Sequence, residues 1–367
     1  MASEENNRGA FAIQEYYCRT MAAPIYARLC TALGQGLSRD SETGRHVLDW
    51  PGEPTRDALP LRLIGGLHAL VLAGGDDELA AIFAGEIDDL AAISAALPGI
   101  LRRNDAALLP WLSGPPQTNE PGRSAALMTG LLEVARRHGP KIEILEIGSS
   151  AGLNLLIDRY RFDLGGVMIG PADSPVAIMP EWRGLPPADA PIEIISVRGC
   201  DVAPMDATDP AVARRLAAYV WAETPERSAR LKAAVEMVRE KSVDLEKADA
   251  ADWIEARLVE PQPEGVTRVL MHSVVWQYLP ERVAERIRVA MKAAGAAATP
   301  ERPIAWVMME PNRAFARPEV RVWSRPGVAA WEIVATAHAH GSWIAGGPPE
   351  NAGTGIAAPQ SAEIDLS

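Results

Sequence analysis

The sequence contains little cysteine, little phenylalanine or tyrosine, and no long apolar or basic run. Three of its 367 residues are cysteine (Cys18, Cys30 and Cys200), and they form no Cys-x-x-Cys pair. A sparse, odd number of cysteines argues against a disulfide framework and is typical of a reducing cytoplasm. Residues 1–10 are polar and acidic, so they lack the basic start and apolar run of a signal peptide. We therefore expect a cytoplasmic protein.

The net charge is negative and the apolar segments are short. Lys and Arg number 36 against 48 Asp and Glu, which gives a formal net charge of -12. This charge opposes loose attachment to nucleic acid or to an anionic membrane, and no run of Lys and Arg suggests a local basic patch. No apolar stretch is long and uninterrupted enough to span a bilayer. We expect neither nucleic acid nor membrane as a partner, and the oligomeric state stays open.

The N-terminal part of the chain has a helical pattern. Across residues 11–112 apolar side chains recur at helical spacing, and Pro24 stands where a helix can begin. No convincing strand precedes residue 140. The loop 113–122 is rich in proline and glycine and marks a boundary. We therefore predict an all-helical N-terminal cap region over residues 1–115.

Beyond residue 140, short apolar runs alternate with helical patterns. This alternation predicts a mostly parallel sheet with helices on both faces, and thus an α/β domain over residues 116–345. A hairpin at the C-terminal end is expected to add an antiparallel edge. Residues 346–367, rich in Gly, Pro and Ala, are expected to form a flexible tail. The expected strands are 142–147, 192–197, 243–248, 266–272 and 304–309, with the hairpin at 320–323 and 331–338 and helices at 123–138, 209–241, from 252, and 281–294.

A glycine-rich turn follows the first expected strand. Ile142–Ile147 leads directly into Gly148-Ser-Ser-Ala-Gly152 and then into Leu153-Asn-Leu-Leu156, which is expected to begin a helix. Glycines permit a sharp turn and the close approach of a ligand, and a helix N-terminus would lie beside it. Glu146 ends the strand at the edge where open α/β sheets bind ligands. An acid at that position suits a cationic or amino-bearing cofactor, whereas a tight connection without a ligand is the alternative.

The spacing acid-x-Gly-x-x-x-Gly resembles the first motif of Rossmann-like methyltransferases. It departs from the dinucleotide pattern G-x-G-x-x-G because Ser150 stands two residues after Gly148. The resemblance implies S-adenosylmethionine as the cofactor, with an acid after the second strand on the ribose and a residue after the third near adenine. Helix or turn caps are the alternative roles for those acids. The predicted cofactor-binding residues are Glu146, Gly148, Ser149, Gly152, Asn154, Asp201, Asp249 and Ala250.

Two further residues are candidates for acid–base chemistry. His272 ends the fourth expected strand, where a neutral imidazole can act as general base, and Glu310 closes the fifth. A buried histidine bonded to the backbone and a surface ion pair are the respective alternatives. His338 and His340 stand two apart in an expected strand, so their side chains would share one face. No third ligand accompanies them, and we predict no metal site.

Blocks of sequence spread over residues 11–344 carry a resemblance to a family. They are Gln117-Thr-Asn-Glu120, Glu146-Ile-Gly-Ser-Ser-Ala-Gly-Leu-Asn-Leu155, Asp158-Arg-Tyr160, Gly170-Pro-Ala-Asp-Ser-Pro175, Gly199-Cys-Asp201, His272-Ser-Val-Val-Trp-Gln-Tyr-Leu-Pro280 and His338-Ala-His-Gly341. These blocks resemble the uncharacterised bacterial family catalogued as domain of unknown function 2332. The resemblance implies a helical N-terminal part and a methyltransferase-like α/β core, and it assigns no catalytic residue.

These features predict an S-adenosylmethionine-dependent methyltransferase acting on an unidentified small molecule or protein. Two alternatives stay open. Residues 148–152 also fit G-x-S-x-G, the nucleophile elbow of α/β-hydrolases, with Ser150 as nucleophile and acids and histidines following in the right order. The elbow normally follows several strands, however, and here helices are expected upstream. The second alternative is a non-catalytic binding protein on the same fold.

Overall fold

The computed structural model describes residues 3–116, 118–312, 317–327 and 330–347. The predicted tail, apart from its first two residues, lies outside this range. The chain divides into two compact units: Met1–Thr118 with Asp209–Ala229, and Asn119–Thr208 with Arg230–Ser367. No helix in the described ranges combines the length and the apolar character needed to cross a membrane.

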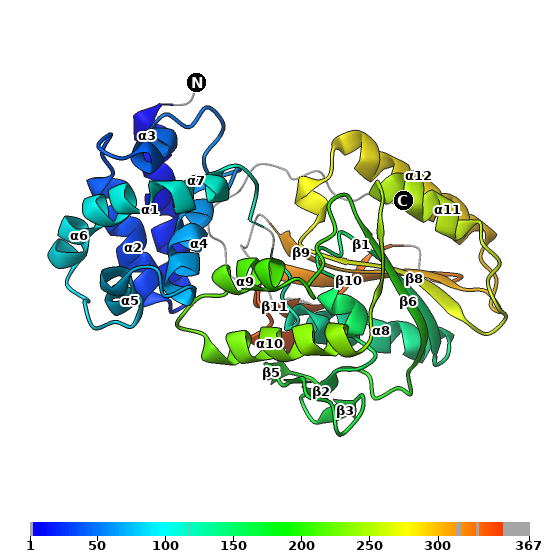
Figure 1. The fold of residues 1–367 in the computed structure, drawn as a ribbon. Helices are drawn as coiled ribbons and strands as arrows, with labels where there is room; N and C mark the ends of the chain where they lie inside the picture. Colours follow the sequence, from blue (N-terminus) through cyan, green and yellow to red (C-terminus); the bar gives the residue numbers. More distant parts are fainter. Residues whose placement is uncertain (1–2, 117, 313–316, 328–329, 348–367) are drawn as a thin grey trace, which may run out of the picture. The chain divides into compact units, whose positions relative to one another are not determined.

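The first unit is helical, as predicted for the N-terminal region (Figure 1, blue and cyan, with α9 in green). Side-chain caps start several of its helices: Ser3, Ser41 and Asp76 each accept a hydrogen bond from a backbone N–H in the first turn. The segment Asp209–Ala229 joins this unit, and its Trp221 stacks on the buried Tyr26 with ring centroids 5.3 Å apart. The helices are α1 (Glu4–Thr20), α2 (Pro24–Gly36), α3 (Glu42–Leu48), α4 (Leu59–Leu72), α5 (Asp77–Phe83), α6 (Leu90–Arg103), α7 (Asp105–Leu112) and α9 (Pro210–Ala218).

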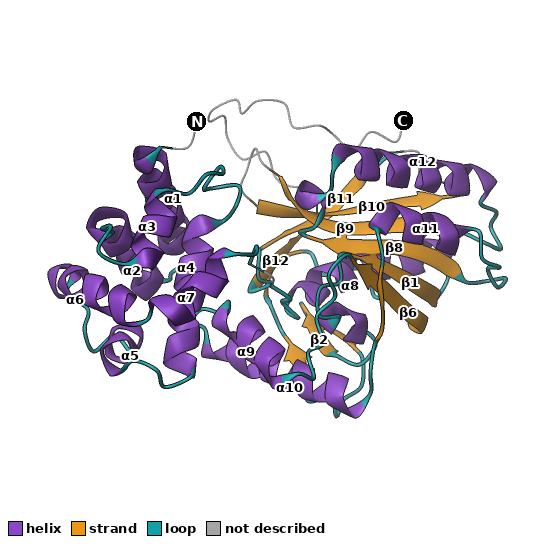
Figure 2. Cartoon of the chain, turned by 45° about the horizontal axis from the view of Figure 1, so that its top comes forward, coloured by secondary structure: helices purple, strands orange, loops and turns teal. Residues whose placement is uncertain are grey.

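The second unit contains a nine-stranded sheet (Figure 2, orange). Its order is β5-β12-β11-β10-β9-β8-β1-β6-β7, and β1, β6, β7, β8 and β9 are mutually parallel. Counted along the chain, these five strands lie in the order 3-2-1-4-5. The predicted mostly parallel sheet with antiparallel C-terminal strands is confirmed. The strands are β1 (Lys141–Ile147), β5 (Glu181–Gly184), β6 (Glu193–Asp201), β7 (Asp244–Lys247), β8 (Thr267–Ser273), β9 (Ile304–Asn312), β10 (Arg317–Arg325), β11 (Glu332–Ala337) and β12 (Trp343–Gly346).

Helices cover both faces of the sheet (Figure 1). One face packs against α8 (Arg123–His138), whose Gly130 lies so close that an added Cβ would be 2.5 Å from Val307 Cγ1. The other face packs against α11 (Ala250–Leu258) and α12 (Glu281–Ala297). α10 (Pro225–Glu240) carries the chain from the first unit into the second. The sheet is therefore enclosed on two sides, which explains why its central strands β1 and β8 are buried almost throughout.

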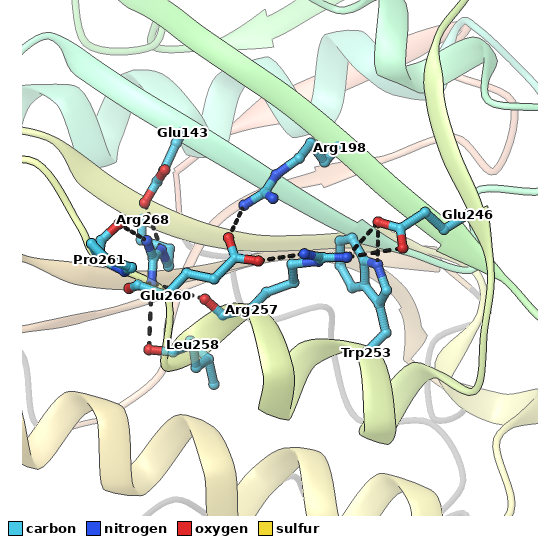
Figure 3. A network of polar contacts seen from close by, with 9 residues as sticks. All are labelled: Glu143, Arg198, Glu246, Trp253, Arg257, Leu258, Glu260, Pro261 and Arg268. Carbon is cyan, nitrogen blue, oxygen red and sulfur yellow. Dashed lines mark hydrogen bonds and ion pairs between the residues drawn. The ribbon is translucent and has the colours of Figure 1, made fainter.

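A network of polar contacts lies between α11 and the sheet (Figure 3). Arg268 on β8 bonds Glu143 on β1 and backbone carbonyls at the end of α11, including that of Arg257. Arg257 in turn pairs with Glu246 on β7 at 2.7 Å, and Glu260 pairs with Arg198 on β6, also at 2.7 Å. These charged side chains pair with one another and with backbone carbonyls, and this pairing offsets the cost of burying their charges.

Two local predictions were wrong. The segment after the glycine turn does not begin an α-helix: it forms the 3-10 turn η1 (Leu153–Leu156) and then a small sheet of β2 (Arg161–Leu164), β3 (Val167–Ile169) and β4 (Ala177–Ile178). Gly165-Gly166 turns β2 back on β3, and both glycines have positive φ, which a helix does not accommodate. His338 and His340 lie in a turn, because β11 ends at Ala337.

Candidate functional site

The carboxyl ends of the parallel strands meet where the strand order reverses. From β1 the chain passes to β6 and β7 on one side, and then to β8 and β9 on the other. The register pairs Glu146 at the end of β1 with Gly199 on β6 and Met271 on β8. Residues just beyond these positions therefore come together at one edge. Open α/β sheets bind ligands at this kind of reversal.

The turn after β1 has an unusual backbone. Gly148, Ser150 and Gly152 all have positive φ, at 69°, 56° and 74°. Two of these positions are glycine, but Ser150 bears a side chain there and is strained. An added Cβ on Gly148 would lie 2.2 Å from Val275 Cγ2, because the loop after β8 packs directly on the turn. Glycine is thus required at position 148 by both conformation and space.

Three side chains that sequence reasoning did not assign hold the segment after the turn. Asn119 Oδ1 accepts the Leu153 N–H at 2.7 Å, and the Tyr160 hydroxyl donates to the Leu153 carbonyl at 2.6 Å. Ser124, at the start of α8, donates to Asn154 Oδ1 at 2.9 Å. Asn119 and Tyr160 belong to the family blocks 117–120 and 158–160, which was the available signal. Their contacts follow from the fold, which no local pattern reports.

Glu146 is a buried acid without a countercharge. It is 1% exposed, and its Oε2 has no hydrogen-bond partner in the described part of the chain. Burial is the main cause that raises the pKa of this carboxyl to about 7, and the negative charge of Asp201 raises it further. Hydrogen bonds from the side chains of Ser149 and Asn154 act in the opposite direction. The structure therefore brings together three of the predicted cofactor residues: Glu146, Ser149 and Asn154.

Asp201 connects the end of β6 to the glycine turn. Its Oδ2 accepts the Ser150 N–H at 2.8 Å, and its Oδ1 accepts the Ala203 N–H at 2.9 Å. This is the turn-cap role that the sequence left open as an alternative. Each carboxylate oxygen accepts more than one hydrogen bond, so the cap leaves capacity for a ligand hydroxyl. Asp201 is half-buried and not sealed in the core.

Asp249 and Ala250 start α11. Asp249 Oδ1 accepts the N–H groups of Ala251 and Asp252 at 2.9 Å and 3.2 Å, which makes it the helix cap. The side chain of Ala250 packs into the core between α11 and the sheet. Ala250 could therefore contact a ligand only through its backbone atoms.

His272 and Glu310 form a bonded pair at the same edge. His272 Nδ1 lies 2.6 Å from Glu310 Oε1, which also accepts the N–H groups of Val275 and Trp276 at 3.0 Å and 3.3 Å. His272 is fully buried and stacks on the Trp276 ring at 5.3 Å. Its Nε2 has no hydrogen-bond partner among the described residues. The pair orients one imidazole and leaves one of its nitrogens uncommitted.

The pleat of the sheet separates this pair from Glu146. Leu145 and Ile147 belong to the core beneath α11 and α12, so Glu146 between them points to the α8 face. Leu270 belongs to the same core, so His272 two residues later lies on the α11 and α12 face. The structure thus gathers the predicted site residues in two groups at one edge of the sheet, on opposite faces.

The two C-terminal histidines lie close together in their turn. Their ring centroids are 5.3 Å apart, and the His340 N–H donates to His338 Nδ1 at 3.2 Å. Arg123 Nε, at the start of α8, donates to the Ala339 carbonyl at 2.9 Å, which ties this turn to the helix. Within the described ranges, no group of three or more His, Cys, Asp or Glu side chains is arranged to hold a metal ion.

Comparison with known proteins assigns the chain to a family. It belongs to the family described as "Uncharacterized protein conserved in bacteria (DUF2332)", whose profile matches residues 8–345. No curated protein and no solved structure matches the chain.

Proposed function

We propose that this member of the family binds S-adenosylmethionine at the glycine turn and methylates an unidentified small molecule or protein. The observation that carries the proposal is Glu146, a buried carboxyl with an unpartnered oxygen at the end of the central strand. S-adenosylmethionine supplies an activated methyl group on a sulfonium. The tasks left to the protein are to bind, to orient and to move a proton.

The strand order supports a nucleotide-type binding sheet of the methyltransferase kind. The order 3-2-1-4-5 places the glycine turn after the first strand, at the point where the order reverses. The turn leads into the four-residue segment η1 and not into a long helix, so no helix dipole is available for a diphosphate. The nearby Asp201, and Glu146 whenever it is ionised, also repel phosphate. A cofactor that lacks phosphate and carries positive charge suits this environment better than a dinucleotide.

The residues present fit such a cofactor. Glu146 would accept the ammonium group through its unpartnered oxygen. Asp201 would bind ribose hydroxyls with the capacity left by its two backbone bonds, and Asp249 would lie near adenine. Gly148 and Gly152 hold the turn open in conformations that other residues rarely adopt.

His272 is the candidate base and Glu310 its positioning partner. A carboxylate at Glu310 accepts only from a protonated Nδ1, and this selects the tautomer whose Nε2 carries the lone pair. Nε2 would then take a proton from the methyl acceptor. Because Glu310 Oε1 already accepts two backbone N–H groups as well, the glutamate orients the imidazole and the loop after β8 together.

Calorimetric titration of S-adenosylmethionine and its demethylated product tests the proposal. The wild-type protein is expected to bind both. Glu146→Gln should weaken binding about tenfold or more, because a charge-assisted hydrogen bond contributes roughly 1.5–3 kcal/mol. Glu143→Gln is the matched control, since this acid lies on the same strand but pairs with Arg268 on the other face. It should lower stability and leave affinity unchanged. Absence of binding by the wild-type protein would refute the proposal.

A hydrolase is the second candidate. Ser150 favours it, because a strained serine on a turn after a strand is the geometry of a nucleophile elbow. Ser150 Oγ and His272 Nε2, however, both lack a hydrogen-bond partner among the described residues, so they are not bonded to each other. We expect a fluorophosphonate probe to leave Ser150 unlabelled. Stoichiometric labelling that Ser150→Ala abolishes would replace the methyltransferase proposal with this one.

A further inference from the structure

Among the described residues, those that act on the Glu146 carboxyl are acids and neutral groups. β6 contributes Asp201 and the thiol of Cys200, and the segment after η1 contributes the Tyr160 hydroxyl. α8 contributes the neutral Ser124 through its bond to Asn154. No ion pair of Glu146 with Lys, Arg or His occurs in the described part of the chain. Asp201 is the charged group that acts on the carboxyl, and its charge is of the same sign.

A buried carboxylate in such surroundings is costly. Removing the ion from water penalises the charged form, and a like charge adds to the penalty. The carboxyl therefore keeps its proton to a higher pH than usual, and its pKa is raised to about 7. The ligand-free site therefore holds a neutral carboxylic acid through the acidic range. Such a group donates or accepts a hydrogen bond but attracts a cation weakly.

We infer that an ammonium-bearing cofactor binds here with release of the Glu146 proton, so that the ligand itself supplies the missing positive charge. The inference rests on the proposed function and adds to it that the site distinguishes ligands by their ammonium group. The carboxyl loses its proton to solvent, the ammonium group stays protonated, and the two form an ion pair. A related ligand without the ammonium group has no means of driving this release, so it binds the protonated site.

The size of the effect follows from the protonation equilibrium. At pH 6 the carboxyl is about nine-tenths protonated, so about 0.9 proton should leave for each cofactor bound. Between pH 5.5 and 7 the ionised fraction rises about 15-fold, and the cofactor affinity should rise by about the same factor. An α-amino group keeps its proton over this range, because its ordinary pKa is about 8.

Titration of the full-length protein at pH 6 in buffers of different ionisation enthalpy measures the released protons directly. The probes are S-adenosylmethionine and 5′-methylthioadenosine, which lacks the ammonium group. We expect about 0.9 proton for the first probe, as above, and none for the second, with an affinity for the second that does not change with pH. Equal proton release for both probes would overturn the inference.

Two variants identify the source of the proton. Glu146→Gln should bind the cofactor weakly with no proton release, whereas Asp201→Asn should keep the release but shift it to lower pH, because the like charge is lost. Loss of release in Asp201→Asn at every pH would assign the proton to that residue and overturn the inference even if Glu146→Gln does not fold. Wild-type binding without proton release overturns the inference alone. No cofactor binding between pH 5.5 and 8 overturns both the inference and the proposed function.

Discussion

Replacement of Arg268 by methionine is expected to destabilise the second unit strongly. The Arg268 side chain is 2% exposed, and its Nε lies 2.5 Å from Glu143 Oε1. Its Nη1 donates to the carbonyls of Arg257 and Glu260, both at 2.9 Å, and its Nη2 to that of Pro261 at 3.1 Å (Figure 3). One guanidinium thus joins β8, β1 and the end of α11, where cations are favoured by the helix dipole.

The magnitude follows from what the substitution leaves behind. Methionine fills most of the volume but removes the positive charge and every donor. The Glu143 carboxylate then stays buried without its partner, and breaking a buried pair in this way costs about 3–5 kcal/mol. Replacing both residues, as Arg268→Met with Glu143→Leu, removes the uncompensated charge. The double variant should therefore be less destabilised than the sum of the two single variants by about 2 kcal/mol.

Urea unfolding followed by circular dichroism and fluorescence measures these differences. Both signals should report a lower midpoint for Arg268→Met at an unchanged slope. Arg302→Met is a suitable control, because its pair with Glu264 is exposed and should contribute no more than about 1 kcal/mol. A loss below about 1 kcal/mol in Arg268→Met, or strict additivity in the double variant, would refute the reasoning.

Three further predictions concern the site. The folded-state pKa of Glu146, about 7, lies above its ordinary value of 4.5. The free energy of unfolding of the ligand-free protein should therefore fall as the pH rises from 4.5 to 7. Glu146→Gln should not show this fall and should be more stable than wild type by about 3 kcal/mol at pH 8 in thermal or urea unfolding, with no gain below pH 4.5. Gly148→Ala should lower the melting temperature through its positive φ and its clash with Val275, and Val275→Ala should restore part of the loss. Tyr160→Phe leaves the buried Leu153 carbonyl without its donor, so it should lower the free energy of unfolding in urea by about 1–3 kcal/mol. It should also weaken cofactor binding, and an unchanged affinity would show that the bond from Tyr160 to Leu153 does not support the site.

The sequence predicted the features that depend on the spacing of neighbouring residues. Helical spacing identified the N-terminal helices, and apolar runs between helical segments identified five parallel strands close to their observed bounds. The glycines at 148 and 152 marked a turn, and both have positive φ there. Glu146 was identified because it ends a strand just before that turn. Each of these inferences needs only neighbouring residues, whose spacing the chain itself carries.

The sequence did not predict that the connection from β1 to β6 runs through a small sheet and not through a helix, and the reason is physical. A βαβ connection is the usual solution, so a helix was expected after the turn. The strands β2 to β4 have only two to four residues each, too few to show an alternating pattern. β12 is equally short, and its parallel pairing with β5 joins residues that are far apart in the chain.

Tertiary structure alone decided which side chains meet. Whether His272 and Glu146 share a face depends on which helices cover each side of the sheet, and the pleat places them on opposite faces. The contact of Asn119 with Leu153 spans 34 residues. The protonation of Glu146 is the clearest case: α8, β6 and the segment after η1 surround it with neutral groups and one like charge, that of Asp201. A sequence shows an acid at a strand end, but only the packed chain determines how much water and how many cations reach it, and these set the proton affinity of the acid.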